Sequence, residues 1–390
     1  MTISLWLDNP AGKVKEEYDL IVVGAGISGA ASAYWLSRRK DLKLAVLDTG
    51  VAGSGATGRS SGFVLRGVMA YYNKMVKTYG RETARSIMQL NEQTQAYIAE
   101  FAESFGNSFS LNKCGSYLLA ASLEELQDLG ESAELMKEDG FELELFKEDP
   151  IDRGYYGAIH TPNDIGVNPR ALVKALIAAS GATLYENEQV YQIAWSNNQP
   201  LLHTQHRHLS ASRVLLCTNA YFPLLQPELA SFIKPVRGQI LVTRPLQERV
   251  IEKLCYANYG YEYFCQLEDN RLLLGGGREP FEDEEVGFAD TVTPAIQTEL
   301  QEYLKDRFPE FAGASIDYRW SGVMGFTSDG LPLIGELTDK PGVVYLTGCN
   351  GHGLGYSMSL SKLLVEFALD GAKPGIFDSR RLTGVKSSAG

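Results

Sequence analysis

YDLIVVGAGISGAASAYWLSRRKDLKLAVLD, residues 18–48, is the stretch that decides the fold. The apolar run 18–23 predicts a strand that is buried on both faces, as strands of parallel sheets are. Glycines in GxGxxG spacing follow it, and the apolar pattern of residues 27–38 predicts a helix. A second apolar strand then ends at Asp48. This order of strand, glycine turn, helix, strand and acid predicts a Rossmann-type βαβ unit.

Each part of the turn has a physical task in binding a dinucleotide. The first glycine permits the tight turn, the second lets a pyrophosphate approach the backbone, and the third lets the helix pack closely on the strand. Amides at the helix start would face the phosphates, and the terminal acid would accept hydrogen bonds from ribose hydroxyls. The residues assigned to the cofactor here are Gly24, Gly26, Ile27, Ser28, Gly29, Asp48 and Thr49.

The coil after the second strand favours FAD over NAD. Residues 50–64, GVAGSGATGRSSGFV, are rich in glycine and serine, where an NAD-binding domain would normally continue into another helix and strand. Such a coil indicates close passage along an extended cofactor. The turn and the coil together resemble the D-amino-acid-oxidase-type FAD oxidoreductases, which include glycine oxidases, sarcosine oxidases and γ-glutamylputrescine oxidoreductases. The resemblance implies contacts to FAD by Thr57, Arg59, Ser60 and Ser61.

The resemblance recurs along most of the chain, in family order, at residues 159–176, 187–193, 213–225, 319–337 and 342–369. It implies cofactor contacts by Val190 (through its backbone, on the adenine side), Thr218 and Gly322. The last segment holds a glycine turn before a helix predicted over 356–369. A helix start beside the flavin would stabilise the negative charge of the reduced ring. The turn adds Gly351, His352, Gly353 and Leu354 to the cofactor site.

The predicted fold class is α/β, with two interwoven domains. A Rossmann-type FAD-binding domain is expected from residues 1–70, 150–231 and 317–390. An α+β substrate domain is expected from residues 71–149, which look largely helical, and residues 232–316, which look strand-like. The resemblance implies that these strands form a mainly antiparallel sheet that covers the flavin.

The substrate side departs from the amino-acid-oxidising members of the family. Met324 stands where those members carry an arginine for the substrate carboxylate, and Gly355 replaces a lysine of the sarcosine oxidase branch. No cysteine for covalent flavin attachment occurs at 321–325. The pattern of 320–335, and the preamble SLWLDNP at 4–10, are more similar to the γ-glutamylputrescine oxidoreductase branch. A carboxylate could still pair with Arg66 or Arg278, either of which could also be structural.

Four residues are candidates for the substrate site: Tyr261, Tyr263, Met324 and His352. The two tyrosines alternate along one face of a predicted strand. They would either pack the sheet or line a pocket with their hydroxyls over the flavin, and we expect the pocket. His352 would lie near the flavin or serve as a structural histidine.

These observations predict a flavoenzyme with non-covalently bound FAD that oxidises the C–N bond of a small amine or amino acid. The substrate would transfer a hydride to the flavin, and water would hydrolyse the imine product. The electrons would pass to oxygen or to another acceptor. No essential side-chain base is predicted, because the substrate nitrogen can lose its proton to solvent first. The alternatives are an NAD-dependent dehydrogenase on a similar fold and a catalytically silent flavin-binding subunit of a larger complex.

Composition narrows the remaining possibilities. The 390 residues carry a net charge of -12, which argues against binding to nucleic acid or anionic membranes. No apolar run is long enough to span a bilayer, and the first residues do not resemble a signal peptide. Five scattered cysteines fit reduced thiols in the cytoplasm. His203, His206 and His208 are expected in a solvent-facing hairpin rather than a metal site. The sequence indicates no oligomeric state.

Overall fold

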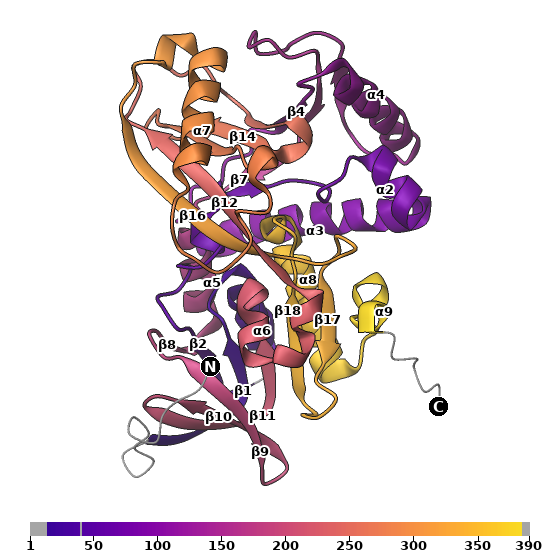
Figure 1. Cartoon of the computed structure of the whole chain (residues 1–390). Helices are drawn as coiled ribbons and strands as arrows, with labels where there is room; N and C mark the ends of the chain where they lie inside the picture. The colour runs from indigo at the N-terminus through magenta and orange to yellow at the C-terminus, as the bar shows by residue number, and fades with distance from the viewer. Residues whose placement is uncertain (1–13, 40, 384–390) are drawn as a thin grey trace.

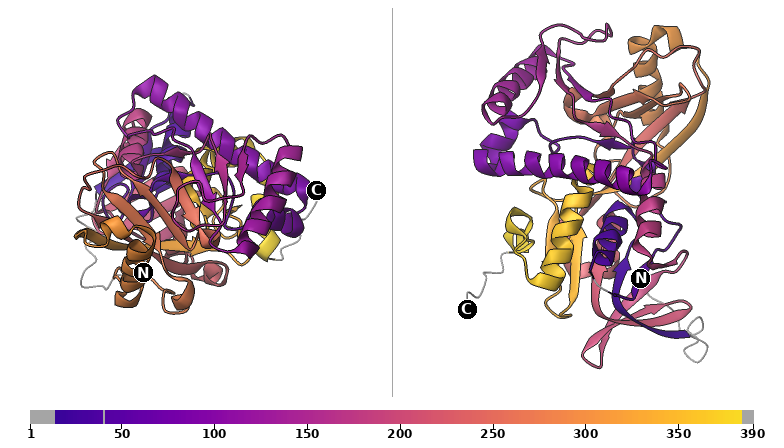
Figure 2. Two further views of the ribbon diagram at one scale, coloured as in Figure 1. Left: turned by 90° about the horizontal axis from the view of Figure 1, so that it is seen from above. Right: turned by 180° about the vertical axis from the view of Figure 1, so that it is seen from behind.

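The computed structural model describes residues 14–39 and 41–383 (Figure 1). The preamble at 4–10, singled out above, lies outside the described residues. Within them the chain forms two eight-stranded sheets and the two-stranded ladder of β3 (Phe63–Val64) and β7 (Ile165–Gly166). Figure 1 shows the first sheet in the lower half of the molecule and the second in the upper half. Helix α3 (Arg81–Phe105) runs between them, as the view from behind in Figure 2 also shows.

The first sheet is built around the predicted βαβ unit. Its order is β17-β18-β11-β1-β2-β8, and β1, β2, β8, β11 and β18 pair in parallel. The central strands β2 and β18 are buried along their whole length. One face of the sheet packs against residues that include Val190, Leu202 and Phe222. The strands are β1 (Val14–Val23), β2 (Leu44–Leu47), β8 (Thr183–Tyr185), β9 (Val190–Ser196), β10 (Gln199–Thr204), β11 (Arg207–Leu216), β17 (Leu333–Glu336) and β18 (Val343–Thr347).

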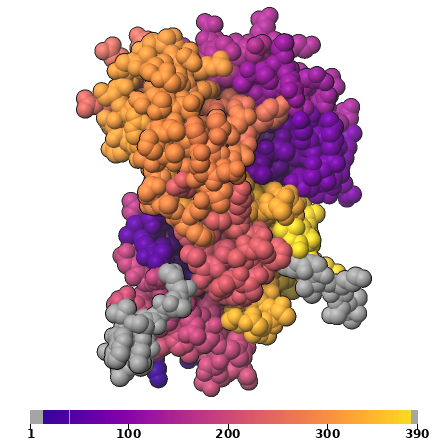
Figure 3. Space-filling model, viewed as in Figure 1, coloured from indigo at the N-terminus to yellow at the C-terminus, as the bar shows by residue number. Residues whose placement is uncertain are grey.

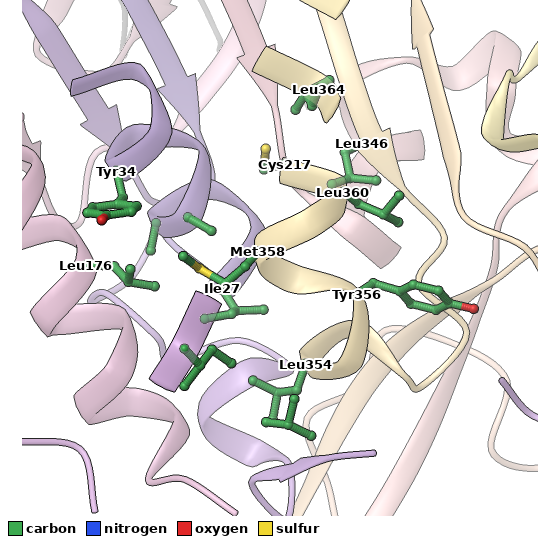
Figure 4. Close-up of a cluster of buried hydrophobic side chains, with 14 of the residues drawn as sticks. Ile27, Tyr34, Leu176, Cys217, Leu346, Leu354, Tyr356, Met358, Leu360 and Leu364 are labelled. Atoms are coloured by element: carbon green, nitrogen blue, oxygen red, sulfur yellow. The ribbon is translucent and has the colours of Figure 1, made fainter. Parts of the chain in front are cut away.

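Three helices pack on one side of this sheet in a single apolar cluster: α1 (Ile27–Ser37), α5 (Pro169–Ser180) and α8 (Gly353–Asp370). Figure 4 shows Ile27, Leu176 and Met358 meeting from the three helices. The start of α5 is fixed by Asn168, whose side chain accepts a hydrogen bond from the amide of Ala171. This cluster holds the starts of α1 and α8 close to the same edge of the sheet.

The second sheet is mainly antiparallel, in the order β16-β12-β15-β14-β13-β4-β6-β5, with β13 and β4 parallel. Its strands are β4 (Ser116–Leu119), β5 (Glu144–Phe146), β6 (Ala158–Thr161), β12 (Lys234–Thr243), β13 (Leu254–Ala257), β14 (Glu262–Gln266), β15 (Leu272–Gly276) and β16 (Ile316–Phe326). Helix α7 (Pro294–Arg307) packs its apolar side, Ile296, Leu300 and Leu304, into the core of this sheet.

The remaining helices are α2 (Tyr72–Tyr79), α4 (Leu123–Glu138), α6 (Phe222–Leu225) and α9 (Arg380–Thr383). Helices α2, α3 and α4 confirm the largely helical segment that was expected after residue 71. In Figure 3 the violet residues of this segment lie beside the orange residues around α7, and together they form the upper half of the molecule. No helix in 14–39 or 41–383 is both long and apolar enough to cross a bilayer.

The α/β architecture with an antiparallel second sheet is confirmed, but two strands differ from the expected segments. Strand β16 was assigned to the FAD-binding segment 317–390, and β6 to the segment 150–231. Both pair in the second sheet. Strand β16 runs antiparallel to β12 in register from Lys234↔Phe326 to Thr243↔Ile316, so the chain returns to the first sheet only after residue 326. This long ladder carries Gly322 and Met324 on the second sheet.

Candidate functional site

A cavity of ≈750 Å³ is lined by residues of both sheets. This volume is typical of small-molecule and cofactor sites, which span about 300–1,000 Å³. Its floor lies at the carboxyl ends of the parallel strands, with Val23, Leu47 and Cys217 among the lining residues. Ligands of open α/β sheets bind at this edge, where helix starts also meet it. Strands of the second sheet supply the opposite wall.

The glycine turn after β1 leaves only backbone at the start of α1. Gly24 has φ +103°, and a Cβ there would lie 2.5 Å from the Cys217 carbonyl oxygen. A Cβ at Gly29 would lie 1.8 Å from the Gly24 carbonyl oxygen, so Gly29 serves the close packing of helix on strand. Gly26 is the N-cap of α1 and has no side chain with which to cap the helix. The turn therefore brings the amides at the start of α1 to the cavity, and Thr57 takes the first of them, that of Ile27.

Asp48 holds two turns together at the edge of the cavity. Its Oδ2 accepts a hydrogen bond from the amide of Ala25 at 2.7 Å, and its Oδ1 accepts one from the amide of Gly50 at 2.8 Å. Burial raises the pKa of this carboxyl, while the two backbone hydrogen bonds act in the opposite direction. Each oxygen can accept a further hydrogen bond, because a carboxylate offers about four lone-pair positions. Asp48 is thus both a structural anchor and a potential acceptor.

The coil 50–64 passes along the cavity and is tied down from both sides. Thr57 Oγ1 accepts a hydrogen bond from the amide of Ile27 at 3.0 Å. Arg59 donates to the carbonyls of Ser54 and Ser321, at 3.0 and 2.8 Å, and forms a two-pronged ion pair with Asp290. The Arg59 guanidinium therefore joins the coil to β16 and to the loop before α7, and its hydrogen-bonding capacity is largely used within the protein.

A second helix start borders the cavity at the closing glycine turn. His352 is the N-cap of α8, and its side chain does not cap the helix. His352 Nδ1 lies 3.1 Å from the carbonyl oxygen of Asn350, which can only accept, so Nδ1 carries the proton. Nε2 then accepts from the Tyr256 hydroxyl at 3.4 Å. Burial lowers the pKa of His352, so the ring is neutral.

The wall that the second sheet supplies is aromatic. Tyr263 on β14 faces Tyr256 on β13 across the antiparallel pair. Its ring covers Gly275, where a Cβ would lie 2.3 Å away, and burial raises the pKa of its hydroxyl to about 12. Tyr261 also lines the cavity, but it precedes β14 rather than alternating along that strand with Tyr263. Its hydroxyl donates to the exposed carboxylate of Glu282. The prediction of one shared strand face for the two tyrosines is therefore wrong.

The two arginines considered for a carboxylate occupy different places. Arg66 is buried against a separate cavity of ≈40 Å³. Its guanidinium pairs with Glu92 at 2.7 Å and donates to the carbonyl of Glu142 at 2.7 Å, so it is structural. Arg278 lines the large cavity.

The cavity suits an extended nucleotide cofactor. The starts of two helices, α1 and α8, whose N-cap residues do not cap them, offer backbone amides and positive helix ends to anionic groups. Two buried hydroxyls that line it, Thr218 Oγ1 and Ser321 Oγ, have no hydrogen-bond partner within the described residues. Buried polar atoms normally find a partner, so a bound group that offers one is expected here. These features fit the phosphates and polar ring edges of FAD.

A family model described as DAO, FAD dependent oxidoreductase, matches residues 19–367. The chain belongs to this family. Among curated relatives of this DAO chain, γ-glutamylputrescine oxidoreductase of Escherichia coli (strain K12) is 29% identical over 370 residues, covering 89% of this chain and 83% of the relative. Glycine oxidase of Geobacillus kaustophilus (strain HTA426) is 27% identical over 360 residues, covering 86% and 89%.

Solved structures of other enzymes share the fold of this DAO-family chain. The crystal structure of glycine oxidase from Geobacillus kaustophilus has a TM-score of 0.77 at 24% identity, covering 92% of this chain and 96% of that one. L-Proline dehydrogenase from P. horikoshii has a TM-score of 0.79 at 21% identity, covering 95% and 99%. The resemblance stated from the motifs is confirmed, and the chain is an FAD-dependent oxidoreductase. An NAD-dependent dehydrogenase and a silent flavin-binding subunit are not favoured.

For this DAO-family chain, the residues expected from the sequence to contact FAD come together in one place. All except Gly29 line the cavity: Gly24, Gly26, Ile27, Ser28, Asp48, Thr49, Thr57, Arg59, Ser60, Ser61, Val190, Thr218, Gly322, Gly351, His352, Gly353 and Leu354. The substrate-site candidates Tyr261, Tyr263 and Met324 line it as well. No cluster of three or more potential metal ligands occurs within the described part of the chain. His203 and His208 face each other across the hairpin of β10 and β11.

The sequence prediction missed Tyr256, Asn219 and Asn350. Tyr256 lies in the aromatic run 256–264, which was a usable signal, but its position opposite Tyr263 depends on the pairing of β13 with β14. The Asn219 side chain accepts from the amide of Cys349 at 3.2 Å, and the Asn350 side chain accepts from the amide of Thr327 at 2.8 Å. Both asparagines have positive φ and brace the turns that line the cavity.

Proposed function

We propose that this chain binds FAD non-covalently in the large cavity and oxidises the C–N bond of a small amine or amino acid. The observation that carries the proposal is a single cavity that is bordered by the starts of helices α1 and α8 and covered by aromatic residues of the second sheet. When bound, FAD would supply an acceptor for two electrons. The protein's part is to hold, orient and shield the reacting groups.

The cofactor end of the proposal assigns roles to the glycine turns. The amides after Gly26 would hold the pyrophosphate, and Asp48 with Thr49 would accept from ribose hydroxyls. Val190 would present its backbone to the adenine. The polar coil residues at 57 and 59–61, with Thr218 and Gly322, would follow the cofactor toward the turn 351–354. The positive end of α8 would there stabilise negative charge on the reduced ring.

We propose that the two sheets have different roles. The first sheet and helices α1, α5 and α8 would form the FAD-binding unit, and the second sheet, including β6 and β16, would form the substrate side. This assignment follows strand pairing rather than the segment boundaries expected from the sequence.

Non-covalent attachment is supported by the chemistry of the cysteines near the site. Cys217 and Cys349 line the cavity. Burial raises the pKa of the Cys217 thiol to about 12 and that of the Cys349 thiol to about 11. A thiol with so high a pKa forms little of the nucleophilic thiolate at neutral pH. All five cysteines are free thiols, which supports our placing the protein in the cytoplasm.

The substrate would bind between the flavin position and the aromatic wall. Tyr256, Tyr263 and Met324 would exclude water from the reacting carbon and fix the orientation of the amine. His352 is neutral and hydrogen-bonded on both ring nitrogens, so it places no positive charge against an ammonium substrate. We assign no side chain as an essential base. The names of the relatives, γ-glutamylputrescine oxidoreductase and glycine oxidase, support an amine or amino acid as the substrate class.

The experiment has two parts. Acid precipitation of the purified chain should release yellow FAD into the supernatant; FAD that stays with the pellet would contradict non-covalent binding. Anaerobic mixing with amines, N-methyl amino acids and D- and L-amino acids should bleach the flavin band for at least one class. Peroxide release on admitting air then distinguishes oxygen from another acceptor. A flavoprotein that no amine in such a screen reduces would contradict the proposed reaction.

A further inference from the structure

Arg278 is held on the wall of the cavity by its neighbours. It follows Gly276 and Gly277, whose φ values of +120° and +69° turn the chain after β15. Its guanidinium lies 5.0 Å from the ring centre of Tyr261 and 5.5 Å from that of Phe326. Stacking on aromatic faces fixes the plane of a guanidinium without using its N–H donors. The side chain is therefore oriented while its donors stay available.

The N–H donors of the Arg278 guanidinium lack good hydrogen-bond acceptors among the described residues. Its nearest carboxylate is Glu282, with Nη1 to Oε1 at 3.8 Å, beyond hydrogen-bonding distance. That carboxylate is half exposed and already accepts from the Tyr261 hydroxyl. No hydrogen bond from the Arg278 guanidinium to another residue is found in the described part of the chain. Arg59, the other arginine on the cavity, makes four hydrogen bonds to protein groups.

Most residues that line the cavity with Arg278 are uncharged; the charged ones are Asp48, Arg59, Glu188 and Asp290. Met324 and Phe326 come from β16, and Tyr256 and Tyr263 from the neighbouring strands. No lysine occurs among the lining residues of the described chain. A cation with unused donors, only 21% exposed and facing an aromatic cavity, is stabilised by an anion that enters the cavity.

We infer that Arg278 binds a carboxylate of the substrate, so that this site takes amino acids or other amines that carry a carboxylate rather than simple alkylamines. The inference rests on the proposed function, because it concerns the substrate of that same site. The planar fork of a guanidinium matches the two oxygens of a carboxylate. The substrate carboxylate is thus recognised by Arg278 after the end of β15, whereas Met324 on β16 contributes only an apolar surface.

Two kinds of substrate share this chemistry. The carboxylate can be attached to the oxidised carbon, as in an α-amino acid, or can lie at the far end of a longer chain, as in an ω-amino acid. The test therefore includes a short and a long carboxylate, each compared with a matching compound that lacks the carboxylate.

Binding is measured first, without turnover. The FAD-loaded full chain is titrated with propanoate and pentanoate, and with propanamide and pentanamide as neutral matches, by flavin absorbance and by calorimetry. We expect the carboxylates to bind and the amides to bind at least tenfold more weakly. Arg278→Met should raise the carboxylate Kd about 10- to 100-fold, as loss of a charged hydrogen bond predicts. Arg278→Lys should fall between.

The matched control is Arg271→Gln, at the other end of the same strand. Arg271 pairs with Asp269 and Asp317 outside the cavity, so the carboxylate Kd should not change. FAD content and Tm of each variant show whether it is folded. Equal binding of carboxylate and amide, or an unchanged carboxylate Kd in folded Arg278→Met, would overturn the inference.

Turnover then separates the two claims. The rate of anaerobic flavin bleaching is measured for each carboxylate and for a match without a carboxylate. Glycine is compared with glycinamide, sarcosine with sarcosinamide, and 4-aminobutanoate with butylamine. If the amines that lack a carboxylate bleach the flavin efficiently, and Arg278→Met does not slow this bleaching, the carboxylate site is refuted and amine oxidation still stands. Tight carboxylate binding with no bleaching by any amine would refute amine oxidation and leave the carboxylate site standing.

Discussion

Alanine substitutions at Gly29 and Gly26, made one at a time, should separate packing from cofactor binding within one glycine turn. At Gly29 the added Cβ would lie 1.8 Å from the Gly24 carbonyl oxygen, which belongs to rigid backbone. Helix α1 must then move by more than 1 Å from β1 to reach a contact of roughly 3 Å or more. Overpacking of this degree costs about 3 kcal/mol or more in unfolding free energy.

At Gly26 the same methyl group meets much less resistance. The Cβ would lie 3.3 Å from Thr57 Oγ1, which requires a shift of a few tenths of an ångström. Alanine is a poor N-cap, so the unfolding free energy should fall by about 1 kcal/mol or less. The methyl group would stand beside the amides that are proposed to hold the pyrophosphate. Losing one charged hydrogen bond there should raise the FAD Kd by about 10- to 100-fold.

Two assays apply to both variants. Thermal unfolding of FAD-free protein should show a Tm lowered by roughly 4 °C or more for Gly29→Ala and by roughly 1 °C or less for Gly26→Ala. Titration of the folded proteins with FAD, followed by quenching of flavin fluorescence, should show the weaker binding for Gly26→Ala. If Gly26→Ala binds FAD as tightly as the unmodified chain, the assignment of the pyrophosphate to this turn is refuted.

Three further predictions follow from the same site. Asp48→Asn replaces one acceptor by a donor opposite the amides of Ala25 and Gly50, and urea unfolding should show a loss of about 1.5–3 kcal/mol; an unchanged midpoint would contradict the anchoring role. Burial lowers the pKa of His352 below its unfolded value, so its contribution to stability is present above about pH 6.5 and is lost as the pH falls below that value. Between pH 7.5 and 5.5 the unfolding free energy of His352→Gln should therefore fall by less than that of the unmodified chain. Parallel pH profiles of the two unfolding free energies would contradict this role of His352. The buried thiols Cys217, Cys265 and Cys349 have raised pKa values, so a thiol reagent at pH 8 should modify them only after unfolding; rapid modification in the folded protein would show that they are accessible thiolates.

Local signals were enough to predict the first sheet and its turns. The apolar run before Gly24, the glycine spacing and the apolar pattern after it are set by neighbours in the sequence, so they predict β1, α1 and β2 directly. The closing turn and α8 follow the same logic: the helix was expected over 356–369 and begins three residues earlier, at Gly353. Steric demands at Gly24 and Gly29, where a Cβ would strike backbone, explain why this signal is strong.

Pairings between distant segments could not be predicted in this way. The segment of β16 was assigned by its motif, whereas its sheet is decided by ten residues of register with β12. Arg59 meets Asp290 from 231 positions away in the chain. The sequence offered no basis for choosing between Arg66 and Arg278 as the partner of a carboxylate. Tertiary packing makes the difference, because it pairs Arg66 with Glu92 and leaves Arg278 on the wall of the cavity.

The claim that most depends on measurement is that the two helix starts enclose one FAD. Spectroscopy of the purified full chain, before and after incubation with excess FAD and removal of the unbound cofactor, tests it directly. We predict a flavin spectrum corresponding to about one FAD per chain, released intact on denaturation. A chain that is folded by thermal unfolding, yet colourless and unable to retain FAD after reconstitution, would contradict the account.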